Sequence, residues 1–178
     1  MQTSKGLVVV LAEDQYECLE VHYPRLRFME AGYTVKVVGP RAKEKFLSKE
    51  GYWAITDSVF ADINPKEVKA LIIPGGLLCP DRLRRYPDCL NLVSQAKANG
   101  AVIGAICHGP WVAISAKILK GVKCTCFFAI KDDVINAGGE YSEQKVVVDK
   151  DHRCVTAQVP DDVAEFMKQI LILLEGTQ

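Results

Sequence analysis

The stretch Ala101-Val-Ile-Gly-Ala-Ile-Cys-His-Gly-Pro110 decides the fold class, because a continuous apolar run changes abruptly into residues that favour a turn. A short run of consecutive apolar residues is typical of a strand that is covered on both faces of a parallel sheet. We therefore predict a strand over residues 101–106, a tight turn over Cys107-His108-Gly109-Pro110 and a helix over residues 111–119. The small residues Gly104 and Ala105 leave room for the sharp turn.

The same alternation of apolar strands and helical segments continues on both sides of this stretch. It indicates a single α/β domain over residues 1–178, a three-layer sandwich with a mostly parallel, flavodoxin-like sheet. Pro24 lies inside a predicted helix, so we expect a kink or a break there. The other predicted strands cover residues 7–12, 34–38, 53–55, 59–61, 70–73 and 123–127, with a hairpin at 146–148 and 154–157. The other predicted helices cover residues 17–31, 88–98, 132–137 and 160–174.

Composition and charge exclude several classes of protein. The 22 basic and 22 acidic residues are balanced, and no basic stripe or polybasic run suggests a nucleic-acid or membrane partner. No apolar run approaches the roughly 20 residues of a membrane helix, and residues 1–6 are too short for a signal peptide. We therefore expect a cytoplasmic protein. The seven cysteines, an odd count, argue against a disulfide framework, and Cys124 and Cys126 lack the spacing of a zinc site, so we expect no metal.

Cys107 is the strongest candidate for chemistry. In open α/β sheets, sites form beyond the carboxyl ends of the strands, and a strand that turns directly into a helix has the geometry of a nucleophile elbow. The start of the helix would favour a thiolate, and the amides near Gly75-Gly76 could form an oxyanion hole with that of His108. From the residues alone, Cys107 could instead be a buried packing residue, and Gly75-Gly76 an ordinary turn.

Several motifs together resemble one family. The nucleophile motif of the PfpI-type intracellular protease/glyoxalase family is similar to residues 105–110, and its P-G-G turn is similar to residues 73–76. Its F-E-D-x-E-x-x-Y-P segment resembles Tyr16-Glu17, Glu20 and Tyr23-Pro24, and residues 130–138 and 159–160 also match. This family belongs to the class I glutamine amidotransferase-like superfamily, together with the Parkinsonism-associated protein. The similarity covers almost the whole chain.

The resemblance implies a role for each matching residue. Cys107 would be the nucleophile, with the Glu17 carboxyl held against its sulfur and His108 as a base or orienting residue. Gly76 and His108 would supply oxyanion N–H groups. From its position alone, Trp111 is either a packing residue or, being close to the turn, a residue that lines a substrate pocket together with Gly75. In the protease branch a Glu of a neighbouring subunit completes a Cys-His-acid triad, and Asp81, one methylene shorter, stands at that position. The loop Leu77-Leu78-Cys79 also departs from the family's Arg-Ala and is one residue longer. Without the resemblance, Glu17 would be an acid that favours a helix start.

Three functions suit a reactive cysteine at this place. We favour an enzyme that acts on reactive carbonyls without a cofactor, converting methylglyoxal-like substrates as a glyoxalase III or deglycase does. The alternatives are an intracellular cysteine peptidase and a redox sensor or chaperone that works through oxidation of Cys107. The expected partners are a small carbonyl compound or a peptide and further copies of the chain, since the resemblance implies a homodimer or hexamer.

Overall fold

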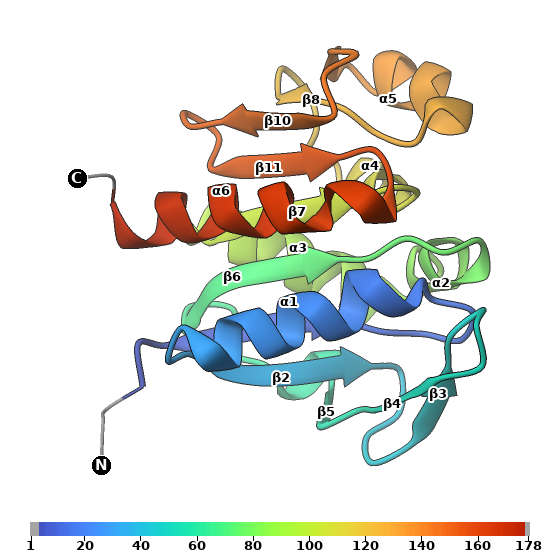
Figure 1. Cartoon of the computed structure of the whole chain (residues 1–178), viewed down its shortest axis with the longest axis vertical. Helices are drawn as coiled ribbons and strands as arrows, with labels where there is room; N and C mark the ends of the chain where they lie inside the picture. Colours follow the sequence, from blue (N-terminus) through green and yellow to red (C-terminus); the bar gives the residue numbers. More distant parts are fainter. Residues whose placement is uncertain (1–3, 177–178) are drawn as a thin grey trace.

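A seven-stranded sheet forms the centre of the computed structural model, which describes residues 4–176 (Figure 1). Its strand order is β10-β11-β7-β6-β1-β2-β5, and every neighbouring pair is parallel except β10 and β11. The mostly parallel sheet expected from the apolar runs is therefore confirmed. The strands are β1 (Leu7–Leu11), β2 (Thr34–Gly39), β5 (Ser58–Val59), β6 (Val68–Ile73), β7 (Val102–Ile106), β10 (Val146–Asp149) and β11 (Cys154–Ala157).

Helices cover both faces of this sheet and make the three layers. Figure 1 shows α1 (Cys18–Glu30) and α6 (Val163–Glu175) side by side in front of it. α3 (Pro87–Ala98) and α4 (Pro110–Ser115) pack on the other face, against β6 and β7. The smaller elements are the hairpin of β3 (Lys45–Leu47) and β4 (Trp53–Ile55), the pair β8 (Lys123–Cys124) and β9 (Glu140–Tyr141), the helices α2 (Leu78–Leu83) and α5 (Lys131–Asn136), and the 3-10 turns η1 (Phe60–Asp62), η2 (Phe128–Ile130) and η3 (Pro160–Asp162).

Four local expectations were wrong. The helix predicted over 111–119 ends at Ser115, shortly before Lys117 adopts a left-handed φ of 59°. The strand predicted over 59–61 is mostly the 3-10 turn η1, and that predicted over 123–127 stops at Cys124. Pro24 does not break α1, because its buried ring packs in the layer against the sheet and offsets the missing backbone hydrogen bond.

The face of α1 that packs on the sheet is not the face that the apolar spacing suggests. Its buried face contains Glu20, Val21, Pro24 and Phe28. The spaced apolar residues that predicted the helix are exposed on the opposite face: Leu19, Tyr23, Leu26 and Met29. The helix itself is confirmed, but one apolar face points to solvent in the single chain and a carboxyl group points inward.

The strand order changes direction at β1, and this sets where a site is expected at the carboxyl edge of the sheet. From β1 the chain moves to β2 on one side and then returns to β6 on the other side of β1. Such a switch in direction opens a site outside the carboxyl ends of β1 and β6. Cys107 follows β7, the next strand along, so it lies at the same edge. No helix within residues 4–176 is long and apolar enough to cross a membrane.

Candidate active site

Cys107 occupies the predicted turn between β7 and α4. Its φ is +59°, a left-handed conformation that is strained for a residue with a side chain. The backbone is held on both sides, since its N–H donates to Ala157 O at 2.9 Å and its carbonyl accepts from Phe127 N–H at 3.0 Å. Gly109 is needed for the turn, because an added Cβ would lie 2.3 Å from Ile73 O. The nucleophile-elbow geometry expected from the sequence is therefore present.

The sulfur of Cys107 is more enclosed than the sequence suggested. The residue is only 8% exposed, and its Sγ lies 3.3 Å from Nδ1 of His108. Burial raises the pKa of the Cys107 thiol to about 12, and the negative charge of Glu20 acts in the same direction. Backbone N–H groups of His108 and Gly76 lower this pKa without reversing the shift. Burial thus acts against the resting thiolate expected from the sequence, because it outweighs two amides and the six-residue helix α4.

Glu20 provides the buried carboxyl group of this site. Its Oε2 accepts a hydrogen bond from Gly75 N–H at 2.6 Å, and its side chain is fully buried. A Cβ added at Gly75 would lie 2.7 Å from Glu20 Oε2 and 2.8 Å from Cys107 Cβ, so the carboxyl group and the cysteine meet at this glycine. Burial raises the pKa of Glu20 to about 8. At neutral pH Glu20 therefore mostly keeps its proton, and its charge acts only weakly on Cys107.

The second oxygen of Glu20 is free to carry that proton. Within residues 4–176, Oε1 is the one buried side-chain oxygen or nitrogen that has no hydrogen-bond partner. A buried polar atom without a partner is costly, so such an atom beside a reactive group calls for a functional explanation. A protonated Oε1 is a donor that can stabilise a thiolate on Cys107 or deliver a proton to a bound molecule.

Glu17 has a different place from the one expected. Its carboxylate caps the start of α1 by accepting from Glu20 N–H at 2.9 Å. Its charge acts on Cys107 less strongly than that of Glu20. The structure thus gives Glu17 the helix-start role that the sequence left as the alternative, and it is Glu20 whose carboxyl meets Cys107 at Gly75.

Aromatic rings surround His108. Phe127 stacks on the imidazole with ring centroids 4.8 Å apart, and Trp111 meets it edge-on at 5.2 Å. Burial lowers the pKa of His108, so the imidazole is neutral at pH 7 and can accept a proton from the Cys107 thiol at Nδ1. Trp111 is fixed by a 2.7 Å hydrogen bond from its Nε1 to Asp133. Trp111 therefore lies beside His108, and its place in a substrate pocket stays a prediction.

Asp81 makes no contact with His108 within the described chain. It lies on α2 and forms an ion pair with Arg85 of the turn that follows this helix. A role for Asp81 as a third catalytic group would require a second copy of the chain, so it stays a prediction.

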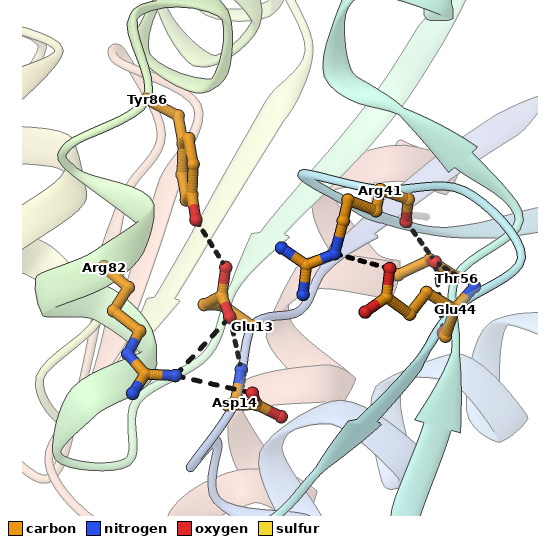
Figure 2. A network of polar contacts seen from close by, with 7 residues as sticks. All are labelled: Glu13, Asp14, Arg41, Glu44, Thr56, Arg82 and Tyr86. Carbon is orange, nitrogen blue, oxygen red and sulfur yellow. Dashed lines mark hydrogen bonds and ion pairs between the residues drawn. The ribbon is translucent and has the colours of Figure 1, made fainter.

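A second buried carboxylate, that of Glu13, helps to hold α2 in position. Glu13, which follows β1, is 2% exposed and accepts from Tyr86 Oη at 2.9 Å (Figure 2). Arg82 of α2 lies 3.7 Å from Glu13 and 3.4 Å from Asp14, and Figure 2 shows it directed at both carboxylates. These contacts fix α2, which begins two residues after the Gly76 amide. A separate cluster of Arg41, Glu44 and Thr56 orders the loop after β2.

Replacing Tyr86 by Phe is expected to lower the free energy of unfolding by about 1–2 kcal/mol, since a hydrogen bond to a buried carboxylate is lost. Urea denaturation at pH 7 measures this change. Tyr141→Phe is the control, because within residues 4–176 the half-buried Tyr141 hydroxyl has no hydrogen-bond partner and lies outside the apolar face of α1. Equal stabilities for the two variants would contradict the role of Tyr86.

The sequence could point to only part of this site. Glu20 belongs to the motif that carries the resemblance, yet the resemblance assigns the role to Glu17, because no signal separates two acids of one helical turn before packing is known. Phe127 and Tyr86 come from segments distant in sequence, and no local pattern marks them. Glu13 follows an apolar strand, and no sequence signal distinguishes it from a solvated loop charge.

Comparison with known proteins identifies the family. The DJ-1/PfpI family model matches residues 7–173. The chain belongs to the DJ-1/PfpI family. A family member from Escherichia coli K12 named protein/nucleic acid deglycase 2 is 37% identical over 168 residues, covering 94% of this chain and 96% of the relative. The deglycase PfpI of Pyrococcus furiosus is 34% identical over 168 residues, covering 94% of this chain and 99% of the relative.

A solved structure shows the same fold in this family. It is a two-domain protein of Anabaena variabilis with DJ-1/ThiJ/PfpI-like and ferritin-like domains, 35% identical with a TM-score of 0.92. The match covers 96% of this chain and 48% of the Anabaena chain. The DJ-1/PfpI fold expected from the sequence is thus confirmed.

Proposed function

We propose that this protein is a cofactor-independent cysteine enzyme that converts small dicarbonyl compounds to hydroxy acids, or removes them from proteins as a deglycase does. The observation that supports this most is the meeting of Cys107, neutral His108 and protonated Glu20 around Gly75. The names of two relatives as deglycases support the same chemistry. Catalytic roles for Cys107, Glu20 and His108 are part of this proposal.

The proposed reaction needs no external oxidant. Cys107 Sγ attacks the aldehyde carbon, and its thiol proton moves to His108, giving a hemithioacetal. The N–H groups of Gly76 and His108, which face the sulfur, stabilise the developing alkoxide. His108 passes this proton to the alkoxide and is neutral again. It then removes the proton from the former aldehyde carbon while Glu20 protonates the neighbouring ketone oxygen, giving an enediol. His108 delivers its proton to the former ketone carbon and Glu20 recovers one from the other hydroxyl group, so the aldehyde carbon is oxidised and the ketone carbon is reduced. Water cleaves the resulting thioester, and dicarbonyl plus water gives a 2-hydroxy acid and the free thiol.

The test is an incubation of the purified protein with methylglyoxal, without added thiol or metal. Formation of lactate, followed by NMR, supports the proposal. Incubation with unfolded casein under the same conditions tests peptidase action, and peptide release without lactate would overturn the proposal. Sulfinic acid formation on Cys107 without either product would point to the redox-sensor alternative.

We also propose that the chain forms a homo-oligomer through the outer face of α1 and the β3–β4 hairpin. Most of the large apolar side chains that are exposed gather here, and a patch of this kind is typical of an interface. His22 of α1 and Tyr52 of the hairpin contact each other with ring centroids 4.9 Å apart, so the two elements form one surface. These exposed side chains are Leu19, Tyr23, Leu26, Met29, Leu47, Tyr52, Trp53 and Ile55.

Leu26→Lys is expected to weaken self-association by at least about tenfold, because it places a charge in an apolar contact. Analytical ultracentrifugation over a range of concentrations measures the effect. Gln95→Lys, on the exposed face of α3, adds the same charge elsewhere and should leave the mass unchanged. A wild-type protein that sediments as a monomer at micromolar concentration would contradict the proposed interface.

A further inference from the structure

Two further exposed apolar side chains belong to the segments on either side of Cys107. Leu77 is 63% exposed and Phe128 is 75% exposed, although both belong to segments that contact the site. An exposed apolar patch beside a reactive group is a candidate for substrate recognition.

The patch has one part on each side of the cysteine. Leu77 lies in the short connection between β6 and α2. It follows Gly76, whose N–H faces the Cys107 sulfur. On the other side Phe127 donates its N–H to Cys107 O at 3.0 Å and stacks on His108 at 4.8 Å. The ring of Phe128 lies 4.6 Å from that of Phe127. Because β6 and the segment beside β11 flank β7 in the sheet, Leu77 and the two phenylalanines border Cys107 from opposite sides.

Charged groups near this rim already have partners. Arg84 lies over the Trp111 ring at 5.7 Å and donates to Ser115 Oγ at 2.8 Å. Asp133 accepts from Trp111 Nε1, and Asp81 pairs with Arg85. These charged groups are thus engaged with one another or with Trp111 and Ser115, whereas the exposed side chains of Leu77 and Phe128 are apolar.

Resting on the proposed function, we propose that Leu77, Phe127 and Phe128 make the enzyme prefer carbonyl substrates with an aromatic or bulky apolar substituent over methylglyoxal. When the aldehyde carbon meets Sγ, a substituent larger than a methyl group extends over the rim. A methyl group is too small to cover it. Burial of apolar surface then favours the larger substrate by about tenfold in kcat/KM.

Two measurements test this selectivity. The first compares kcat/KM for phenylglyoxal and methylglyoxal, followed as mandelate and lactate. The second compares the rates at which N-benzyl and N-methyl iodoacetamide alkylate Cys107, each divided by its rate with the thiol of glutathione. Wild-type protein should favour the aromatic compound by about five- to tenfold in both measurements.

Variants locate the effect. Leu77→Arg and Phe128→Ala should each reduce the preference to about twofold, since each removes part of the apolar rim. Gln95→Arg adds the same charge on α3 and should leave the preference unchanged. Equal rates for the two alkylating agents on wild-type protein would overturn the proposal, as would a preference that survives in Leu77→Arg and Phe128→Ala. A changed sedimentation mass in these two variants would also overturn it, because the rim would then be an interface between chains.

The two measurements separate this proposal from the proposed function. Selective alkylation without turnover of either dicarbonyl would overturn the proposed function and support the apolar rim. Turnover of both dicarbonyls without selective alkylation would support the function and overturn the rim.

Discussion

Cys107→Ser is expected to lower the rate of lactate formation from methylglyoxal by at least about 10³-fold, because the serine hydroxyl is a far weaker nucleophile. Serine is close in size to cysteine and can occupy the same strained turn, so the fold should persist. The melting temperature should change by no more than a few degrees. Lactate measured by NMR and thermal unfolding followed by circular dichroism give the two quantities.

The matched control is Cys18→Ser. Cys18 is partly exposed, whereas the other described cysteines are buried. If free thiols in general caused the reaction, Cys18→Ser would lose as much activity as Cys107→Ser. Full activity in Cys18→Ser and none in Cys107→Ser is the result that assigns the chemistry to the turn after β7.

The raised pKa of Cys107 affects the first step of the proposed reaction, the attack of the sulfur on the carbonyl carbon. A thiol with a pKa of about 12 is almost fully protonated at pH 7, so attack on a carbonyl must be coupled to loss of the proton. Neutral His108, 3.3 Å from the sulfur, is placed to accept it. We therefore expect general-base attack in place of a permanently ionised cysteine.

The sequence predicted the features that depend on local order along the chain. The run of residues 101–106 followed by Cys107-His108-Gly109-Pro110 allows little besides a buried strand and a sharp turn, and the structure has both. The hairpin of β10 and β11 and the final helix follow in the same way, since alternation and capping residues mark their ends. The parallel arrangement of the central strands could also be expected, because these strands are apolar on both faces.

The features that sequence could not provide depend on which way an element faces. Leu19, Tyr23 and Leu26 have helical spacing, yet they point outward, while Glu20 points into the core. Only the packing of α1 on the sheet decides between these faces, and a surface for a second copy uses the same apolar pattern as a core. The structure places Glu20, and not Glu17, beside Gly75 for the same reason. The way α1 faces the sheet decides which of the two carboxyl groups caps the helix and which one lies beside Gly75.

Glu20 gives the second large prediction, a loss of stability as pH rises. Burial raises its pKa from 4.5 to about 8 in the folded chain. Between these values the folded state holds a proton that the unfolded state has lost, so the free energy of unfolding falls with pH. This contribution is complete below about pH 4.5 and is lost as pH rises through about 8, a change of roughly 3–5 kcal/mol at 1.36 kcal/mol per pKa unit.

Glu20→Gln isolates this effect, because an amide stays neutral, can accept from Gly75 N–H and can donate towards the sulfur. Urea denaturation at pH 5 and pH 8.5 should show that wild-type protein loses roughly 3–5 kcal/mol relative to Glu20→Gln as pH rises. Carboxylates with lowered pKa, such as Asp149, act at lower pH with the opposite sign and cancel in the comparison. Glu30→Gln, on the exposed part of the same helix, should show no such divergence. A stability difference between wild type and Glu20→Gln that stays constant from pH 5 to pH 8.5 would mean that Glu20 is ionised throughout, and the proton assigned to Oε1 would then be absent.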